Sequence, residues 1–120
     1  MNKKILIIDD DVGTLRLVEG ILSSNGFNVI KASDGEEGLA KVCNEAPDLV
    51  ILDVIMPEIN GYDVCYELRF NNEYEKVPII LLTVRPQELG VELSERVNIG
   101  YVSKPIDADL LLEKINSLLN

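Results

Sequence analysis

The chain has 120 residues, 47% of them hydrophobic, which suits one folded domain over residues 1–120 and excludes a disordered segment. Its net charge of −10 argues against direct binding to nucleic acid, because phosphate backbones require a basic protein face. No apolar run is long enough to span a membrane and no signal-peptide pattern opens the chain, so we expect a cytoplasmic protein without membrane contact.

The first half of the chain alternates apolar, β-branched runs with segments of helical period. The first helix should end at Asn25-Gly26, because both residues tolerate a left-handed cap. Ser33 and Glu36 are spaced as a capping box for the second helix. In this half we expect strands at about residues 4–9, 28–32 and 49–53, and helices at about 12–24 and 34–44.

The second half continues the same alternation. A loop that ends at Gly61 precedes the third helix, and Asp107 is suited to cap the last one. Pro86 fits a first helical turn, although Gly90 lowers the helix propensity of that segment. We expect strands at about residues 77–82 and 101–103, and helices at about 62–70, 86–97 and 108–120. Five strand–helix units predict an α/β fold with a doubly wound parallel sheet.

Polar residues follow four of the predicted strands at the point where each strand ends. The carboxyl ends of parallel strands meet at one edge of a sheet, so these side chains should converge there. Crowded carboxylates repel one another unless a cation or a protonated amine neutralises them. The pattern therefore favours a magnesium site with a lysine beside it, which suits phosphate chemistry. The residues concerned are Asp9, Asp10, Asp53, Thr83 and Lys104, whereas Asp11 is interpreted as the cap of the first helix.

Several other kinds of site are excluded by composition. The chain has no histidine, and its two cysteines, Cys43 and Cys65, do not form a CxxC pair. Zinc sites, Cys/His nucleophiles and Ser/His/Asp triads therefore have no basis. We expect both cysteines to be small buried residues.

The motifs, taken together, resemble the receiver domain of two-component response regulators. They are Ile7-Ile8-Asp9-Asp10-Asp11, Ala32–Leu39, Asp48–Pro57, Gly61, Leu82-Thr83 and Tyr101-Val102-Ser103-Lys104-Pro105, and they span essentially the whole chain. The resemblance implies a flavodoxin-like fold with five helices and a five-stranded sheet in the order 2-1-3-4-5. It also implies a role in phosphorelay signal transduction, with no enzymatic activity beyond Mg-dependent self-phosphorylation and autodephosphorylation.

The resemblance implies a set of roles for the acidic residues. Asp53 would be the phosphoacceptor, taking its phosphoryl group from a sensor histidine kinase or a phosphotransfer protein. Asp10 and Asp53 would ligate Mg²⁺ directly together with the backbone carbonyl of Ile55, and Asp9 would hold the ion through water. Mn²⁺ could substitute for Mg²⁺. This layout matches the preference of Mg²⁺ for one or two carboxylates plus waters and a phosphate oxygen.

The remaining implied roles concern the response to phosphate. Lys104 would pair with Asp53 and then with the phosphoryl oxygens, and the Lys104–Pro105 bond would be cis. Thr83 would donate a hydrogen bond to the phosphoryl group, and Tyr101 would be the coupled aromatic switch. The surface of helix 4, strand 5 and helix 5 would then contact an output domain or a downstream protein.

Three residues around the predicted site should modulate access to it. Val84 follows Thr83 where the family usually has a small residue, so it should narrow access to the phosphoryl group. Ile55 and Arg85 flank the expected path of the hydrolytic water, and the apolar Ile55 cannot orient that water. A long-lived phosphoryl group is therefore expected.

Three alternative functions compete with this interpretation. A haloacid-dehalogenase-type enzyme would need a second acid two residues after the nucleophile, and Asp53-Val54-Ile55 lacks it. A flavodoxin-like electron carrier is disfavoured because three consecutive aspartates would repel a flavin phosphate. A pseudo-receiver that only binds proteins is disfavoured because all five core residues are present. The cognate kinase, the output, the oligomeric state and any further domains stay open.

Overall fold

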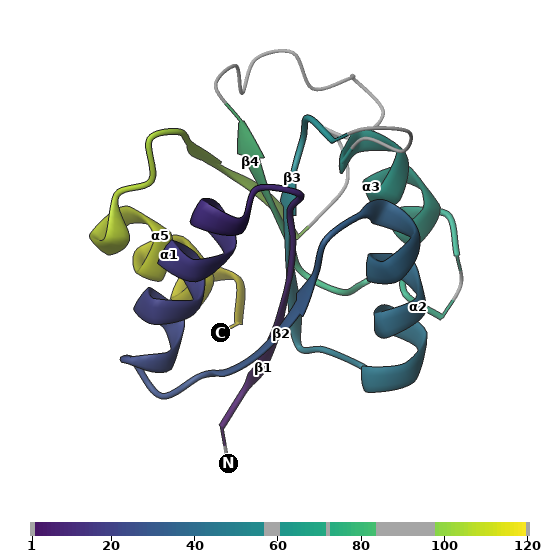
Figure 1. The fold of residues 1–120 in the computed structure, drawn as a ribbon. Helices are drawn as coiled ribbons and strands as arrows, with labels where there is room; N and C mark the ends of the chain where they lie inside the picture. The colour runs from purple at the N-terminus through teal and green to yellow at the C-terminus, as the bar shows by residue number, and fades with distance from the viewer. Residues whose placement is uncertain (1, 57–60, 72, 84–97, 120) are drawn as a thin grey trace.

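The computed structural model describes residues 2–56, 61–71, 73–83 and 98–119, and its five strands form one parallel sheet in the order β2-β1-β3-β4-β5 (Figure 1). This confirms the predicted topology. Four helices lie within the described residues, and the predicted helix at 86–97 lies outside them. The elements are β1 (Lys4–Ile8), α1 (Val12–Ser23), β2 (Asn28–Ala32), α2 (Gly35–Glu45), β3 (Leu49–Asp53), α3 (Gly61–Arg69), β4 (Ile79–Thr83), β5 (Ile99–Ser103) and α5 (Ala108–Leu119).

The sheet separates two apolar layers. Helices α1 and α5 cover one face and α2 and α3 cover the other (Figure 1). Side chains alternate between the layers along each strand, so that Ile5 and Ile7 pack with α1 and α5, while Leu6 and Ile8 pack on the opposite side. Strands β3 and β4 are buried along their whole length, as expected for central strands of a parallel sheet.

Two strands begin two residues away from their predicted starts, and β1 ends one residue earlier than predicted. Strand β4 begins two residues late, because the N–H of Val77 donates to Tyr74 in a turn and Pro78 has no N–H to give. Strand β5 begins two residues early, because Ile99 pairs with Ile79 across the sheet. The hydrophobic pattern of the sequence alone did not indicate that Ile99 pairs with β4.

The helix caps explain where the helices begin. Asp11 caps α1 by accepting from the N–H of Gly13, as predicted. The predicted capping box of Ser33 and Glu36 is wrong by one residue. Asp34 is the cap of α2, and the carboxylate of Glu37 reaches back to accept from both the N–H and the hydroxyl of Ser33.

The two cysteines have different environments. Cys65 is buried in the α3 side of the core, as expected, and burial raises the pKa of its thiol to about 11. Cys43 is exposed, so its prediction was wrong: it follows the buried Val42 on α2 and faces solvent. Within the described residues, no helix has the length and apolar content needed to cross a membrane.

Candidate functional site

The predicted acids and the lysine converge at the carboxyl edge of the sheet. Asp9 follows β1 directly, Asp53 ends β3, and Lys104 follows β5. The Nζ atom of Lys104 lies 3.1 Å from Oδ1 of Asp53 and 3.9 Å from Oδ2 of Asp9. One carboxylate oxygen from each of Asp9, Asp10 and Asp53 lies within 4.8 Å of the others. Residues far apart in sequence thus share one small acidic site.

Asp9 is fully buried at this edge. Its Oδ1 accepts from the N–H of Asp11 at 2.9 Å, whereas its Oδ2 accepts no hydrogen bond among the described residues. Burial raises the pKa of Asp9 to about 7, the hydrogen bond from Asp11 opposes this rise, and the charge of Asp53 adds to it. A buried carboxylate oxygen without a donor is a position that a cation would stabilise.

Asp53 is nearly as buried, with 5% of its surface exposed. Its Oδ1 accepts from the Lys104 ammonium and, at 3.3 Å, from the N–H of Ile55. Asp9 and Asp53 therefore each accept from the backbone N–H two residues further on, as aspartates do in Asx-turns. The sequence prediction did not include these backbone donors, although an aspartate at a strand end that enters a turn is the pattern that signals them.

The donor set fits a hard divalent cation. Three carboxylates supply oxygen atoms, and Asp10 is the exposed member. Asp9 also has an oxygen that accepts no hydrogen bond from the described residues. Mg²⁺ binds oxygen ligands and keeps several waters, so an open acidic site of this kind could hold it. Asp11 is outside the cluster, since its carboxylate accepts from Gly13 and from the hydroxyl of Thr14.

The predicted response residues lie on the two neighbouring strands. Thr83 ends β4, is 7% exposed, and accepts through its backbone carbonyl from the N–H of Lys104. Tyr101 on β5 is 38% exposed and pairs in register with Leu81. The Lys104–Pro105 peptide bond is cis, which is the isomer that the family resemblance implied.

The residues predicted to modulate access fall into two groups. The Ile55 side chain is 73% exposed, beside the acidic cluster in sequence and structure. Val84 and Arg85 lie outside the described residues, so their predicted roles stay predictions.

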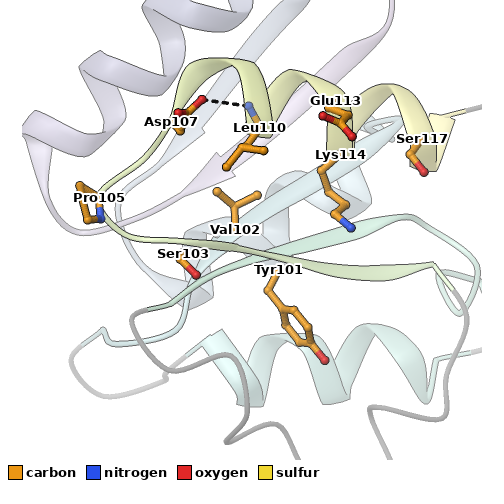
Figure 2. A pocket seen from close by; sticks show the side chains of 9 residues that line it. All are labelled: Tyr101, Val102, Ser103, Pro105, Asp107, Leu110, Glu113, Lys114 and Ser117. Atoms are coloured by element: carbon orange, nitrogen blue, oxygen red, sulfur yellow. Dashed lines mark hydrogen bonds between the residues drawn. The ribbon is translucent and has the colours of Figure 1, made fainter.

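A pocket lies between β5 and α5 (Figure 2), and its lining includes Ser103 and Pro105, the two sequence neighbours of Lys104. Leu110 on α5 is 59% exposed and sits above Val102, while Tyr101 points to the other side of the strand (Figure 2). Asp107, the predicted cap of the last helix, accepts from the N–H of Leu110 at 3.1 Å. The pocket carries both apolar and charged side chains, and its lining is Tyr101, Val102, Ser103, Pro105, Asp107, Leu110, Glu113, Lys114 and Ser117.

Comparison with known proteins places the chain in a family. The family model of the response regulator receiver domain matches residues 5–116. The chain is 38% identical, over 99% of its length, to the alkaline phosphatase synthesis transcriptional regulatory protein PhoP of Bacillus subtilis, and covers 49% of that protein. It is 33% identical, over 97% of its length, to protein PilH of Pseudomonas aeruginosa, and covers 97% of it.

Solved structures agree with these relatives. The chemotaxis response regulator CheY4 of Vibrio cholerae superposes with a TM-score of 0.88 at 29% identity, covering 99% of this chain and 100% of that one. A putative response regulator from Chloroflexus aurantiacus gives a TM-score of 0.88 at 28% identity, covering 99% and 98%. The chain spans about half the length of several curated relatives, PhoP among them. It belongs to the response regulator receiver domain family.

Proposed function

We propose that this protein is a phosphorylation-dependent switch in which Asp53 accepts a phosphoryl group from a phosphohistidine of a sensor kinase or a phosphotransfer protein. The observation that carries the proposal is the convergence of three carboxylates and one ammonium group at a single edge of the sheet. This set provides a nucleophile, a site for a divalent cation and a fixed positive charge. Those are the parts that phosphoryl transfer to a carboxylate requires.

Phosphoryl transfer to Asp53 has to overcome the repulsion between two negatively charged groups. A carboxylate and a phosphoryl group are both anionic, so they repel as they approach. A bound Mg²⁺ ion would neutralise part of this charge, with Asp9, Asp10, Asp53 and the carbonyl of Ile55 as the groups that hold it. A carboxylate oxygen of Asp53 forms the new bond to phosphorus while the bond from phosphorus to the donor nitrogen breaks.

Lys104 contributes a positive charge that does not depend on the metal. Its ammonium lies 3.1 Å from Asp53 and is part-buried, so it can stabilise the charge that develops on the phosphoryl oxygens. The product is an aspartyl phosphate, which water can hydrolyse to reset the switch.

The response follows from the new charge beside β4. A phosphoryl group adds roughly two negative charges and three strong hydrogen-bond acceptors. Thr83, at the end of β4, would donate its hydroxyl to one of them, and Tyr101 would turn inward on the neighbouring strand. The altered surface of β5 and α5, together with the predicted helix at residues 86–97, would contact an output domain or a downstream protein. The phosphorylated form favours a conformation already present at low population.

A mass measurement tests the proposal. The wild type and Asp53→Asn are incubated with Mg²⁺ and acetyl phosphate, and their intact masses are compared. We expect one added phosphoryl group on the wild type only, dependent on Mg²⁺ and located on Asp53 by peptide mapping. Circular dichroism confirms that both proteins are folded. A folded wild type that gains no phosphoryl group at any Mg²⁺ concentration, or an equal gain on Asp53→Asn, would contradict the proposal.

A further inference from the structure

The first residue of α3 contacts the backbone of the proposed phosphoacceptor. Gly61 is buried, and its N–H donates a hydrogen bond of 2.9 Å to the carbonyl of Val54, the residue after Asp53. The N–H of Val54 in turn donates to the carbonyl of Leu82 on β4 at 3.1 Å. The two peptide groups that follow Asp53 are therefore both held by hydrogen bonds, one donated to β4 and one accepted from α3.

Residue 61 has no room for a side chain. A Cβ atom there would press against the carbonyl oxygen of Asp53, and it would lie 2.8 Å from Cα of Val54 and 2.9 Å from the carbonyl carbon of Asp53. These are backbone atoms, which cannot rotate away as the end of a side chain can. The close approach of two backbones is therefore a reason that glycine is required at this position.

Other glycines of the chain differ in this respect. A Cβ atom at Gly38 would meet the side chain of Ile8, and one at Gly100 would meet the flexible side chain of Lys114. A Cβ atom at Gly20 would meet nothing within 4 Å. The backbone contact at Gly61 therefore links this helix to the site in a way that the side-chain contacts at Gly38 and Gly100 do not.

We propose that Gly61 is a positioning residue, which sets where the Asp53 carboxylate and the Ile55 carbonyl lie relative to Asp9 and Asp10. The inference rests on the proposed function, in which these groups hold Mg²⁺. The connection is short, because the Asp53 carboxylate accepts from the N–H of Ile55 at 3.3 Å and is thus tied to the backbone that Gly61 contacts. A methyl group at residue 61 would push α3 away from this backbone, and the oxygen atoms would no longer converge on one cation.

A matched pair of variants tests the inference. Gly61→Ala adds an atom beside Asp53, whereas Leu68→Ala loosens the packing of the same helix without touching the site, since Leu68 is 2% exposed and lies in the core. Urea denaturation gives the stability of each variant, and calorimetry gives its Mg²⁺ affinity under conditions where it is folded. We expect Gly61→Ala to bind Mg²⁺ about 10-fold more weakly than Leu68→Ala, as when a group that orients a ligand is lost. Phosphorylation of Asp53 should slow by a similar factor, and Leu68→Ala should keep the wild-type affinity.

The outcomes separate this inference from the proposed function. Equal Mg²⁺ affinities for folded Gly61→Ala and Leu68→Ala would overturn the positioning role alone. A wild-type protein that binds no Mg²⁺ would overturn the proposed function and this inference with it.

Amide hydrogen exchange in the wild type tests the same inference without a substitution, and so applies even if Gly61→Ala does not fold. If opening of the Gly61–Val54 hydrogen bond disrupts the metal site, Mg²⁺ must slow exchange of the Gly61 N–H in step with occupancy. We expect a decrease of about 100-fold when Mg²⁺ is at 100 times its Kd. The Ser117 amide, near the end of α5, should not change. If saturating Mg²⁺ does not change the exchange rate of the Gly61 N–H, the positioning role is overturned.

Discussion

At the scale of single residues, Lys104 has two opposing effects on the site. Its ammonium lies 3.1 Å from Asp53 and 3.9 Å from Asp9, so it offsets the repulsion between two buried carboxylates. The same positive charge also repels a cation that binds those carboxylates. Lys104 therefore stabilises the metal-free site; it would also stabilise a transferred phosphoryl group, but it would compete with a metal ion for the acids.

We expect Lys104→Gln to strengthen Mg²⁺ binding but to slow phosphorylation of Asp53. Mg²⁺ should bind more tightly, because a positive charge near its ligands is removed. Phosphorylation of Asp53 by acetyl phosphate should slow by about 100-fold, because a charged donor to the phosphoryl oxygens is lost. Calorimetry and the time course of the intact mass measure the two effects. Weaker Mg²⁺ binding in the variant would contradict the assigned balance of charges.

At the scale of elements, Arg69 joins the end of α3 to the starts of two strands. Its side chain is buried, and one guanidinium nitrogen donates to the carbonyl of Val77 at 2.6 Å and to that of Asn98 at 3.0 Å. Asn98 has a left-handed backbone with φ of 64°, and its side chain donates to Lys76. Because this junction lies at the edge opposite the acidic site, it holds the base of β4 and β5 together.

Arg69→Met should lower the free energy of unfolding by about 2 kcal/mol, since hydrogen bonds from a charged donor to buried carbonyls are lost while the chain length is kept. Urea denaturation measures the change. Glu67→Met, an exposed substitution on the same helix, is the control and should have little effect. Equal stabilities of the two variants would show that the junction does not depend on this arginine.

At the scale of the whole molecule, the acidic site opposes folding when no cation is bound. The chain already carries a net charge of −10, and the cluster places three acids within a few ångströms. Carboxylates that must stay close repel one another. The protein therefore keeps at this edge a group of charges that destabilises the metal-free fold, as functional sites often do.

Whether the wild type or the Asp10→Asn variant is the more stable protein should depend on Mg²⁺. Without the metal the variant should be the more stable protein, because one of the repelling charges is gone. With Mg²⁺ at 100 times the wild-type Kd, the wild type should gain about 2.7 kcal/mol, and the variant should gain less. Thermal unfolding with and without Mg²⁺ measures both. If the Asp10→Asn variant is less stable than the wild type when Mg²⁺ is absent from both, the expected repulsion between the carboxylates is contradicted.

The hydrophobic pattern predicted the parallel sheet and the resemblance to receiver domains implied its strand order, but some local contacts required the three-dimensional structure. Runs such as Leu49–Asp53 are buried on both sides, so apolar content and the terminal acid identified the strand and one site residue together. The start of β5 was missed because Gly100 and Ile99 gain their strand geometry from pairing with β4. The backbone contact of Gly61 was missed because no local pattern indicates which backbone will lie against a helix start.

Burial along the strands implies an uneven stiffness across the sheet. Asp53 ends a central strand that is hydrogen-bonded on both sides and buried throughout, and Asp9 follows a strand that also has neighbours on both sides. β5 is an edge strand with alternate exposed residues, and it has a neighbour on one side only. We expect a displacement at Asp53 to be resisted by the buried central strands and to be taken up at the edge strands, β2 and β5, which both carry exposed residues. Of these two edges, β5 is the one that carries Tyr101.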